Sequence, residues 1–224
     1  MTQRDVAQTI DISAVRTHHT LSDIEEIVAY AKEYRFINVH ALPCWIKMLA
    51  DMLKDVEDVY AGSPVGFPGG AHKTETKILE AKMLLEDGVD EMDIVMNVGR
   101  FKNKEYDFVL EEVKQIIDMA KGKAMTKVLI ELNCLTDFEM EKACELVVNS
   151  GADFLKTGTG WVPGGANIDR IRRIKQLVGK DVKIKAAGGI RTKEEYLELS
   201  ELGVERFGIN TQSAIEITKQ FDRK

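Results

Sequence analysis

Four charged residues stand inside apolar segments of this chain, where a buried strand ordinarily carries none: Asp93, Glu131, Lys156 and Lys185. Burying an unpaired charge is costly, so such residues either have a partner or take part in chemistry. A second ammonium nearby, together with partial desolvation, lowers the pKa of a lysine and supplies the neutral amine that attacks a carbonyl carbon. These residue types predict that Lys156 and Lys185 act together in imine chemistry, with Asp93 orienting them and relaying protons.

A structural interpretation stays open for each of these residues. Either lysine could pair with a neighbouring carboxylate or point outward at the end of its strand. Asp93 could form a salt bridge with one of the same lysines, and Glu131 allows the same two interpretations.

Glycine-rich segments that could bind phosphate follow three of the apolar runs. Residues 163–166 read Pro-Gly-Gly-Ala, residues 187–191 read Ala-Gly-Gly-Ile-Arg, and residues 207–212 read Phe-Gly-Ile-Asn-Thr-Gln. Glycines let backbone N–H groups approach an anion, and a helix N-terminus favours negative charge. One glycine pair is more often a plain turn, but three such loops beside two lysines predict a phosphate site. Its expected residues are Gly164, Gly165, Gly188, Gly189, Gly208, Asn210 and Thr211.

Short apolar runs alternate with longer amphipathic segments along the chain. The runs are rich in Val, Ile and Leu and show little alternation of apolar and polar residues, which is typical of strands covered on both faces in a parallel sheet. They are residues 9–12, 36–42, 58–65, 91–98, 127–132, 153–157, 182–187 and 205–209.

The amphipathic segments between these runs have the pattern of helices. The first is expected to begin at Ser22 as N-cap, with Glu25 as its capping-box partner. Several of the others stop at a glycine, the usual C-terminal signal. They are residues 45–56, 74–86, 106–121, 136–150, 168–178, 192–202 and 211–221.

Eight strand candidates alternating with eight helix candidates predict a single-domain (β/α)8 barrel over residues 1–224. An open doubly wound sheet is the alternative, but the glycine fingerprint expected after its first strand does not follow Ile12. Catalytic residues of such barrels lie at the carboxyl ends of strands, and phosphate often binds the loops after the seventh and eighth strands. Lys156 and Lys185 fall on the sixth and seventh strands, which are neighbours.

Composition narrows the class of protein. Of 224 residues, 44% are hydrophobic and 30% charged, which is typical of a globular chain. A net charge of −6 creates no cationic field for nucleic acid or an anionic membrane, and no apolar run reaches the roughly 18 residues of a membrane helix. Three cysteines without a CxxC pair fit a reducing compartment, and the N-terminus lacks a signal pattern. We expect a cytoplasmic protein without nucleic-acid or membrane partners.

With these residues aligned, the chain resembles the deoxyribose-phosphate aldolase family, class I aldolases with a (β/α)8 fold. The resemblance runs from Ile10 to Ile217. Its most specific parts are residues 65–71 (Val-Gly-Phe-Pro-Gly-Gly-Ala), 88–95 (Gly-Val-Asp-Glu-Met-Asp-Ile-Val), 151–160 (Gly-Ala-Asp-Phe-Leu-Lys-Thr-Gly-Thr-Gly) and 185–192 (Lys-Ala-Ala-Gly-Gly-Ile-Arg-Thr).

The resemblance implies a lyase of carbohydrate catabolism that reversibly cleaves 2-deoxy-D-ribose 5-phosphate to glyceraldehyde 3-phosphate and acetaldehyde. Lys156 would form the Schiff base, Lys185 would depress its pKa, and Asp93 would assist proton transfer. No metal or other cofactor is implied, because the protonated imine itself is the electron sink. The glycines after the seventh strand and the start of the last helix would hold the sugar phosphate, and the protein would be a homodimer.

Several positions depart from the family pattern, mostly at the substrate end. His40-Ala-Leu42-Pro stands where the family has Cys-Val-Asn-Pro, while Gly158 and Ala187 replace serines. Asn210-Thr211 replaces a serine pair, and Arg16 replaces a lysine. We hypothesise that Arg16, His40, His72 and Lys73 make the pocket more positive, so that it accepts another phosphorylated aldehyde or ketose. The expected lining residues are Asp11, Arg16, His40, His72, Lys73 and Thr157.

Two further functions remain open. A metal-dependent lyase or isomerase on the same barrel would need histidine ligands, for which His18, His19, His40 and His72 are the candidates. A non-catalytic phosphate-binding barrel would keep the glycine loops but would not need two adjacent lysines.

Overall fold

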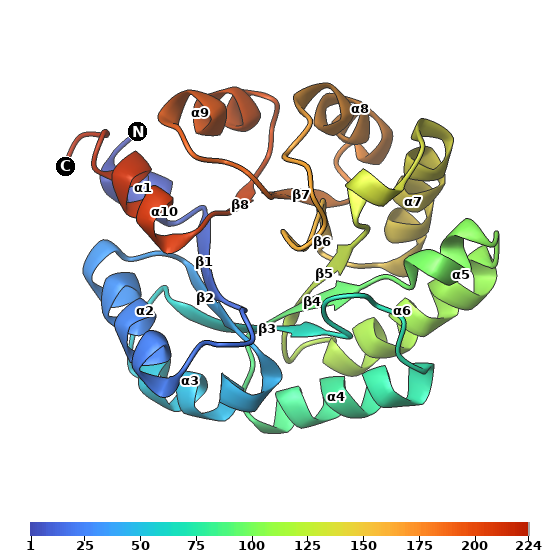
Figure 1. Cartoon of the computed structure of the whole chain (residues 1–224), viewed down its shortest axis with the longest axis horizontal. Coiled ribbons are helices and arrows are strands. Elements are labelled where there is room, and N and C mark those ends of the chain that lie inside the picture. Colours follow the sequence, from blue (N-terminus) through green and yellow to red (C-terminus); the bar gives the residue numbers. More distant parts are fainter. Residues whose placement is uncertain (224) are drawn as a thin grey trace.

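Eight parallel strands close into a barrel in chain order, from β1 to β8 and back to β1 (Figure 1). The computed structural model describes residues 1–223. The closed barrel confirms the predicted (β/α)8 fold and excludes the open sheet. The strands are β1 (Ile10–Ala14), β2 (Asn38–Ala41), β3 (Tyr60–Val65), β4 (Glu91–Val95), β5 (Met125–Leu129), β6 (Phe154–Lys156), β7 (Lys183–Ala187) and β8 (Arg206–Gly208).

Helices surround the barrel and cover the outer faces of its strands (Figure 1). Each turns an apolar stripe inward; in α8, for example, Ile171, Ile174 and Val178 are buried while the arginines between them face solvent. The main helices are α2 (Leu21–Tyr34), α3 (Ile46–Leu53), α4 (Thr74–Glu86), α6 (Tyr106–Ala120), α7 (Asp137–Ser150), α8 (Ile168–Val178), α9 (Lys193–Glu201) and α10 (Thr211–Thr218). None of the helices within residues 1–223 is long and apolar enough to cross a bilayer.

The predicted boundaries of some elements are wrong, and capping explains the clearest cases. Helix α2 is capped by Thr20 rather than Ser22: the Thr20 backbone N–H donates to Asp23 Oδ2 at 2.6 Å, so Asp23, not Glu25, completes the capping box. The fourth apolar run ends at Val95, because Asn97 caps a short helix, α5 (Val98–Lys102). Sequence patterns also missed a helix at the N-terminus, α1 (Gln3–Ala7), and 3₁₀ turns at Pro43–Trp45 and Leu132–Cys134.

Side chains on the strands do alternate, contrary to the expectation from the sequence. On β4 the outward Met92 and Ile94 pack in the apolar core, whereas Glu91 and Asp93 join ion pairs inside the barrel. All four are buried, since the polar face looks into the closed barrel rather than to solvent. On β4 the buried run therefore includes a charged inner face, and ion pairs inside the barrel compensate the buried charges of that face.

A buried ion pair shapes the loop between β3 and α4. Lys77 of α4 is fully buried, and its Nζ lies 2.5 Å from Glu112 Oε1 and donates to the Val95 carbonyl at 2.8 Å. Glu80 accepts a hydrogen bond from the Gly66 backbone at 2.6 Å. At Gly70, which has φ +67°, a Cβ would lie 2.2 Å from the Met96 carbonyl oxygen, so only glycine fits there. These contacts fix the loop against the end of β4, next to Asp93.

We predict that Lys77→Met lowers the unfolding free energy by about 3 kcal/mol, because the buried Glu112 carboxylate loses its partner. Lys82→Met, on the same helix, is the control: Lys82 and Glu86 are exposed and 3.9 Å apart, so the expected loss is under about 1 kcal/mol. Denaturant unfolding measures both. Equal losses in the two variants would contradict the assigned role of the buried pair.

Candidate active site

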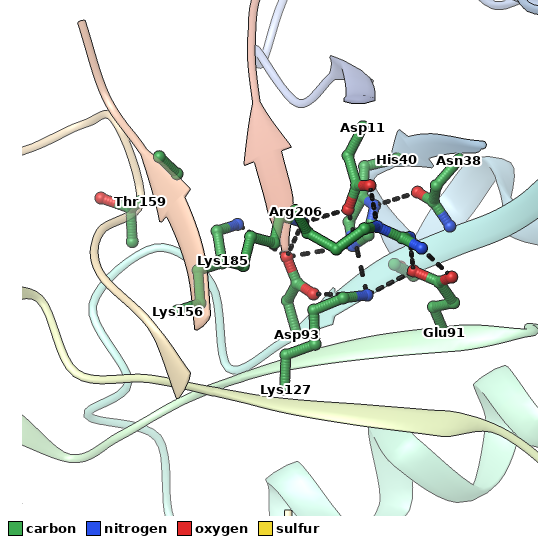
Figure 2. A network of polar contacts seen from close by, with 12 residues as sticks. Asp11, Asn38, His40, Glu91, Asp93, Lys127, Lys156, Thr159, Lys185 and Arg206 are labelled. Atoms are coloured by element: carbon green, nitrogen blue, oxygen red, sulfur yellow. Dashed lines mark hydrogen bonds and ion pairs between the residues drawn. The ribbon is translucent and has the colours of Figure 1, made fainter. Parts of the chain in front are cut away.

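Asp93 lies at the centre of a buried charge network inside the barrel (Figure 2). Its Oδ2 accepts hydrogen bonds from Lys156 Nζ at 2.6 Å and from Lys185 Nζ at 3.0 Å, and His40 Nε2 lies 3.1 Å from the same oxygen. Lys156 and Lys185 are directly opposite each other in the register of β6 and β7. The two amines and Asp93 therefore come together as the sequence predicts, with Lys156 at the carboxyl end of β6 and with Lys185 and Asp93 in the middle of β7 and β4.

A second set of ion pairs supports this centre from the side of β1, β5 and β8. Arg206 Nε donates to Asp11 Oδ1 at 2.8 Å, and Arg206 Nη2 donates to both Glu91 oxygens at 2.7 Å. Lys127 pairs with Glu91 and lies 3.4 Å from Asp93 Oδ1. Asp11 Oδ2 lies 2.5 Å from Lys185 Nζ, which links the two sets. This interlocked arrangement holds each side chain in one position.

The network carries more positive than negative groups. Lys127, Lys156, Lys185 and Arg206 face only three carboxylates, those of Asp11, Glu91 and Asp93. A surplus cation in a buried site favours the loss of one proton from an amine. Burial lowers the pKa of Lys185 to about 8, and the charges of Lys156 and Lys127 act in the same direction against Asp11 and Asp93. The network thus makes the neutral amine of Lys185 accessible near neutral pH.

Asp93 remains ionised in this setting. Burial alone would raise its pKa, but His40, Lys156, Lys185 and Lys127 hold that pKa well below its usual value. A carboxylate that stays charged can accept hydrogen bonds from both lysines at once. The same contacts are a salt bridge and also orient the two lysines, so the structural and the chemical interpretations of Asp93 both apply.

A cavity of about 440 Å³ opens above the two lysines. Its walls come from loops at the carboxyl ends of the strands, and Lys156, with 12% of its side chain exposed, reaches its floor. Arg16 lines the mouth, where its guanidinium lies 5.2 Å from the ring centre of Trp161. The predicted residues that line the cavity are Asp11, Arg16, His40, Lys156, Lys185, Gly188, Gly189, Gly208, Asn210 and Thr211.

Backbone groups form one side of the cavity. Gly188 and Gly189 have φ of +102° and +80°, so their conformations suit glycine, and Asn210 caps the N-terminus of α10. The free N–H groups of that helix end favour an anion. Of the three predicted glycine loops, the last two line the cavity.

Other predicted residues lie outside the cavity. Gly164 and Gly165 are exposed, and their loop packs on the β7–α9 loop, where Ala166 N–H donates to the Gly188 carbonyl at 2.8 Å. His72 and Lys73 were expected to line the substrate site, but both are exposed outside the cavity, because Lys73 is the N-cap of α4 and His72 directly precedes it.

Thr157 and Glu131 organise the site rather than line it. Thr157 is buried, and its hydroxyl bridges to the backbone of Ala187, which ties the ends of β6 and β7 together. Glu131 accepts hydrogen bonds from the Thr159 backbone and hydroxyl, which favours the structural interpretation of this carboxylate.

Sequence patterns missed several members of the site. Lys127, Arg206 and Asn38 belong to the buried network, and Arg191 lines the cavity. A signal was present for Arg206 and Asn38, since each lies on a strand two residues from a glycine or another polar residue, Gly208 and His40 respectively. Lys127 lies between Met125 and Leu129 on its face of the strand and had no such signal. Arg191 lies on a loop, where no periodicity marks it.

Comparison with known proteins gives the family. No protein-family profile matches the chain. Deoxyribose-phosphate aldolase of Rhizobium meliloti is 42% identical over 217 residues, which cover 97% of this chain and 87% of that protein. The chain belongs to the deoxyribose-phosphate aldolase family. The deoxyribose-phosphate aldolase of Thermococcus kodakarensis is 41% identical over 221 residues, covering 98% of each chain.

Solved structures agree with this family. An aldolase named QR15 superposes with a TM-score of 0.89 at 36% identity, over 96% of this chain and 95% of that one. The deoxyribose phosphate aldolase of Aeropyrum pernix, described as tetrameric, gives 0.86 at 28% identity, over 98% and 92%. The resemblance found in the sequence is confirmed. Among residues 1–223 of this aldolase-family chain, no group of three or more His, Cys, Asp or Glu side chains is arranged to hold a metal ion.

The buried imidazole of His40 should make the unfolding free energy depend on pH. Burial lowers the pKa of His40 from 6.5 to about 4, against the pull of Asp93. Between these values the unfolded chain binds a proton that the folded protein does not, so the unfolding free energy should fall as the pH falls from 6.5 to 4, by up to about 3 kcal/mol.

Denaturant unfolding across that pH range, compared between the wild type and His40→Gln, isolates the contribution of this group. The wild type should lose more stability than the variant as acid is added. A wild type that loses no more than the variant would show that His40 is protonated in the fold.

Proposed function

We propose that this chain is a class I aldolase that cleaves and forms 2-deoxy-D-ribose 5-phosphate through an imine on Lys156. The observation behind the proposal is that Lys156 and Lys185 both donate to one oxygen, Asp93 Oδ2. This contact lies at the floor of a cavity that has glycines along one wall. Family membership supports the same substrate, since the relatives are named deoxyribose-phosphate aldolase.

The chemistry begins with the amine of Lys156. Its nitrogen attacks the C1 aldehyde carbon, and loss of water from the carbinolamine leaves an iminium. The C2–C3 bond then breaks: its electrons form the enamine, and the C3 hydroxyl gives up its proton as glyceraldehyde 3-phosphate departs. Protonation of the enamine carbon and hydrolysis release acetaldehyde and restore the amine.

Asp93 and Lys185 are suited to carry the protons in these steps. Both touch or flank the Lys156 nitrogen, and the pKa of Lys185, about 8, lies near neutral pH, where proton transfer in both directions is efficient. We assign Lys156 as the nucleophile, and Lys185 and Asp93 as the proton-transfer pair.

The opposite side of the cavity is suited to the phosphate. Gly188, Gly189 and Gly208 leave backbone exposed, and Asn210 with Thr211 begins α10. An anion held there fixes the sugar with its aldehyde end toward Lys156, and such positioning makes the bimolecular aldol addition effectively intramolecular.

The resemblance and the composition indicate the setting of the enzyme. The resemblance supports a homodimer, and the cysteine composition supports a reducing compartment. We therefore propose a cytoplasmic homodimeric enzyme of carbohydrate catabolism. Sedimentation of the purified chain tests the dimer, and a monomer or tetramer there would contradict it.

Borohydride reduction tests the imine. With acetaldehyde present, we expect irreversible inactivation and the added mass of one ethyl group on the peptide that contains Lys156. Lys156→Met should abolish trapping and lower kcat by at least about 10³-fold. Lys183→Met is the matched control, because Lys183 lies on the same strand as Lys185 but is exposed at the other end of the barrel.

Two results would contradict this mechanism. Full aldol activity in Lys156→Met would indicate a barrel that does not use this imine. Loss of activity on chelation, without trapping, would instead indicate the metal-dependent alternative.

A different phosphorylated sugar is the second candidate substrate, because the departures from the family pattern line the cavity. His40, Ala187, Asn210 and Thr211 all face it, whereas His72 and Lys73 do not. The added positive character is therefore limited to Arg16 at the mouth, since burial keeps His40 neutral at pH 7.

A cleavage assay over phosphorylated 2-deoxy and 2-hydroxy sugars separates the two candidates. We expect the highest kcat/KM for 2-deoxyribose 5-phosphate. Another sugar with a kcat/KM about tenfold higher would assign the substrate to the second candidate while leaving the imine mechanism intact.

A further inference from the structure

The imidazole of His40 fills space inside the barrel next to β3, where the facing residue, Gly62, has no side chain. His40 lies on the inner face of β2 and is only 4% exposed. Across the ladder, His40 is paired with Gly62 of β3, where a Cβ would lie 2.4 Å from ring atoms Cε1 and Nδ1. No residue with a side chain fits at position 62 while the imidazole is present. Gly62 and His40 thus form a complementary pair.

Both ring nitrogens of His40 face polar groups. Nε2 lies 3.1 Å from Asp93 Oδ2, and Nδ1 contacts Oδ1 of Asn38, two residues earlier on the same face of β2 (Figure 2). Asn38 is fully buried, and within residues 1–223 neither its Nδ2 nor His40 Nε2 has a hydrogen-bond partner. Rotation of this amide by 180° would make Nδ2 a donor to Nδ1 and leave the ring proton on Nε2, directed at Asp93, which gives both atoms a partner.

Burial is the main reason that the His40 ring is neutral, and the charges around it act in opposite directions. Asp93 on β4 and Asp11 on β1 attract a proton to it, while Lys185 on β7 and Lys127 on β5 repel one. Burial adds to the repulsion and decides the balance. The ring is therefore an uncharged hydrogen-bond donor among charged ones.

We propose that His40 is a positioning residue that acts through Asp93. It donates a hydrogen bond from Nε2 to Asp93 Oδ2 while the Lys156 nitrogen is covalently bonded to the substrate. The inference rests on the proposed function, since it assigns a task within the imine reaction. During that reaction the Lys156 nitrogen is bonded to the substrate carbon and is uncharged in the carbinolamine and in the enamine, so in those intermediates Asp93 loses the attraction of the ammonium charge. Lys185 and His40 are the two remaining groups on the same oxygen.

A neutral donor is suited to this task for an electrostatic reason. A third cation on Oδ2 would add to the positive surplus of the network, whereas an N–H from a neutral ring stabilises the carboxylate without adding charge. An apolar side chain would remove one donor from this buried oxygen while the Lys156 nitrogen is uncharged. The carboxylate would then rotate or take up a proton, and either change would slow proton transfer.

Replacement of His40 by an apolar residue and by a donor tests the proposal. His40→Leu should lower kcat by at least about tenfold, with KM changed by less than about threefold, because leucine nearly fills the volume of the largely buried imidazole that it replaces. His40→Gln, whose amide can donate from a similar position, should recover most of kcat.

His18→Gln is the matched control, because His18 is exposed and does not line the cavity. It should leave kcat and KM unchanged. The proposal is overturned if His40→Leu keeps kcat within about twofold of the wild type, or if His40→Gln is as impaired as His40→Leu.

Gly62 supplies a second test that keeps the histidine. Gly62→Ala should push the ring away from Asp93 and lower kcat in the wild-type background, because its Cβ would overlap the imidazole. In a His40→Ala background the same substitution should lower kcat by a smaller factor, because the added Cβ then meets only Asn38 Oδ1, at 2.7 Å. Additive losses in this double-mutant cycle would contradict the coupling of the two residues.

These experiments separate failure of the inference from failure of the proposed function. Trapping of the Lys156 imine by borohydride reports the function independently of kcat, and all folded His40 variants should still be trapped. Normal trapping with an unchanged kcat in His40→Leu overturns only the role of His40. A wild type that is not trapped overturns the proposed function and the inference with it.

Discussion

The carboxylate of Asp93 is the constraint on which the site depends. A closed barrel buries Lys185 and His40 almost completely, and removal of charge from water is unfavourable unless partners compensate. One oxygen of Asp93 gathers Lys156, Lys185 and His40, and this shared contact forces the two amines together. Their proximity, with burial, is what makes a neutral amine accessible. Stability and chemistry therefore depend on the same oxygen.

Different parts of the barrel position the reacting groups and form the substrate cavity. Strands carry the charged network, in which Asp11, Glu91, Lys127 and Arg206 lock the centre from one side through interlocked ion pairs. Loops and the start of α10 form the cavity walls, where the departures from the family pattern are found. The mechanism can thus be retained by rigid strands while the substrate end varies. His40 is the exception, since this departure lies on a strand and contacts the centre itself.

Much of the fold was predictable because its signals are local. Apolar runs, glycine stops and capping boxes such as that at Thr136 lie within a few residues of each other, so the alternation of strands and helices could be seen directly. The start of α2 was missed because Thr20 and Ser22 both fit an N-cap, and only the hydrogen bond to Asp23 distinguishes them. His72 and Lys73 were misplaced because the path of the loop after Gly70 depends on its contact with the Met96 backbone.

The sequence by itself determined the eightfold alternation, the pair of lysines on adjacent strands and the candidate carboxylate, because strand periodicity and burial are properties of neighbouring residues. Only the tertiary structure decided that Asp93 meets Lys185 across 92 residues, that Lys127 and Arg206 complete the network, and that His40 joins it through the space at Gly62. These contacts exist because closure of the barrel brings the inner faces of all eight strands together around one interior. No local pattern in the chain encodes which side chains then face one another across it.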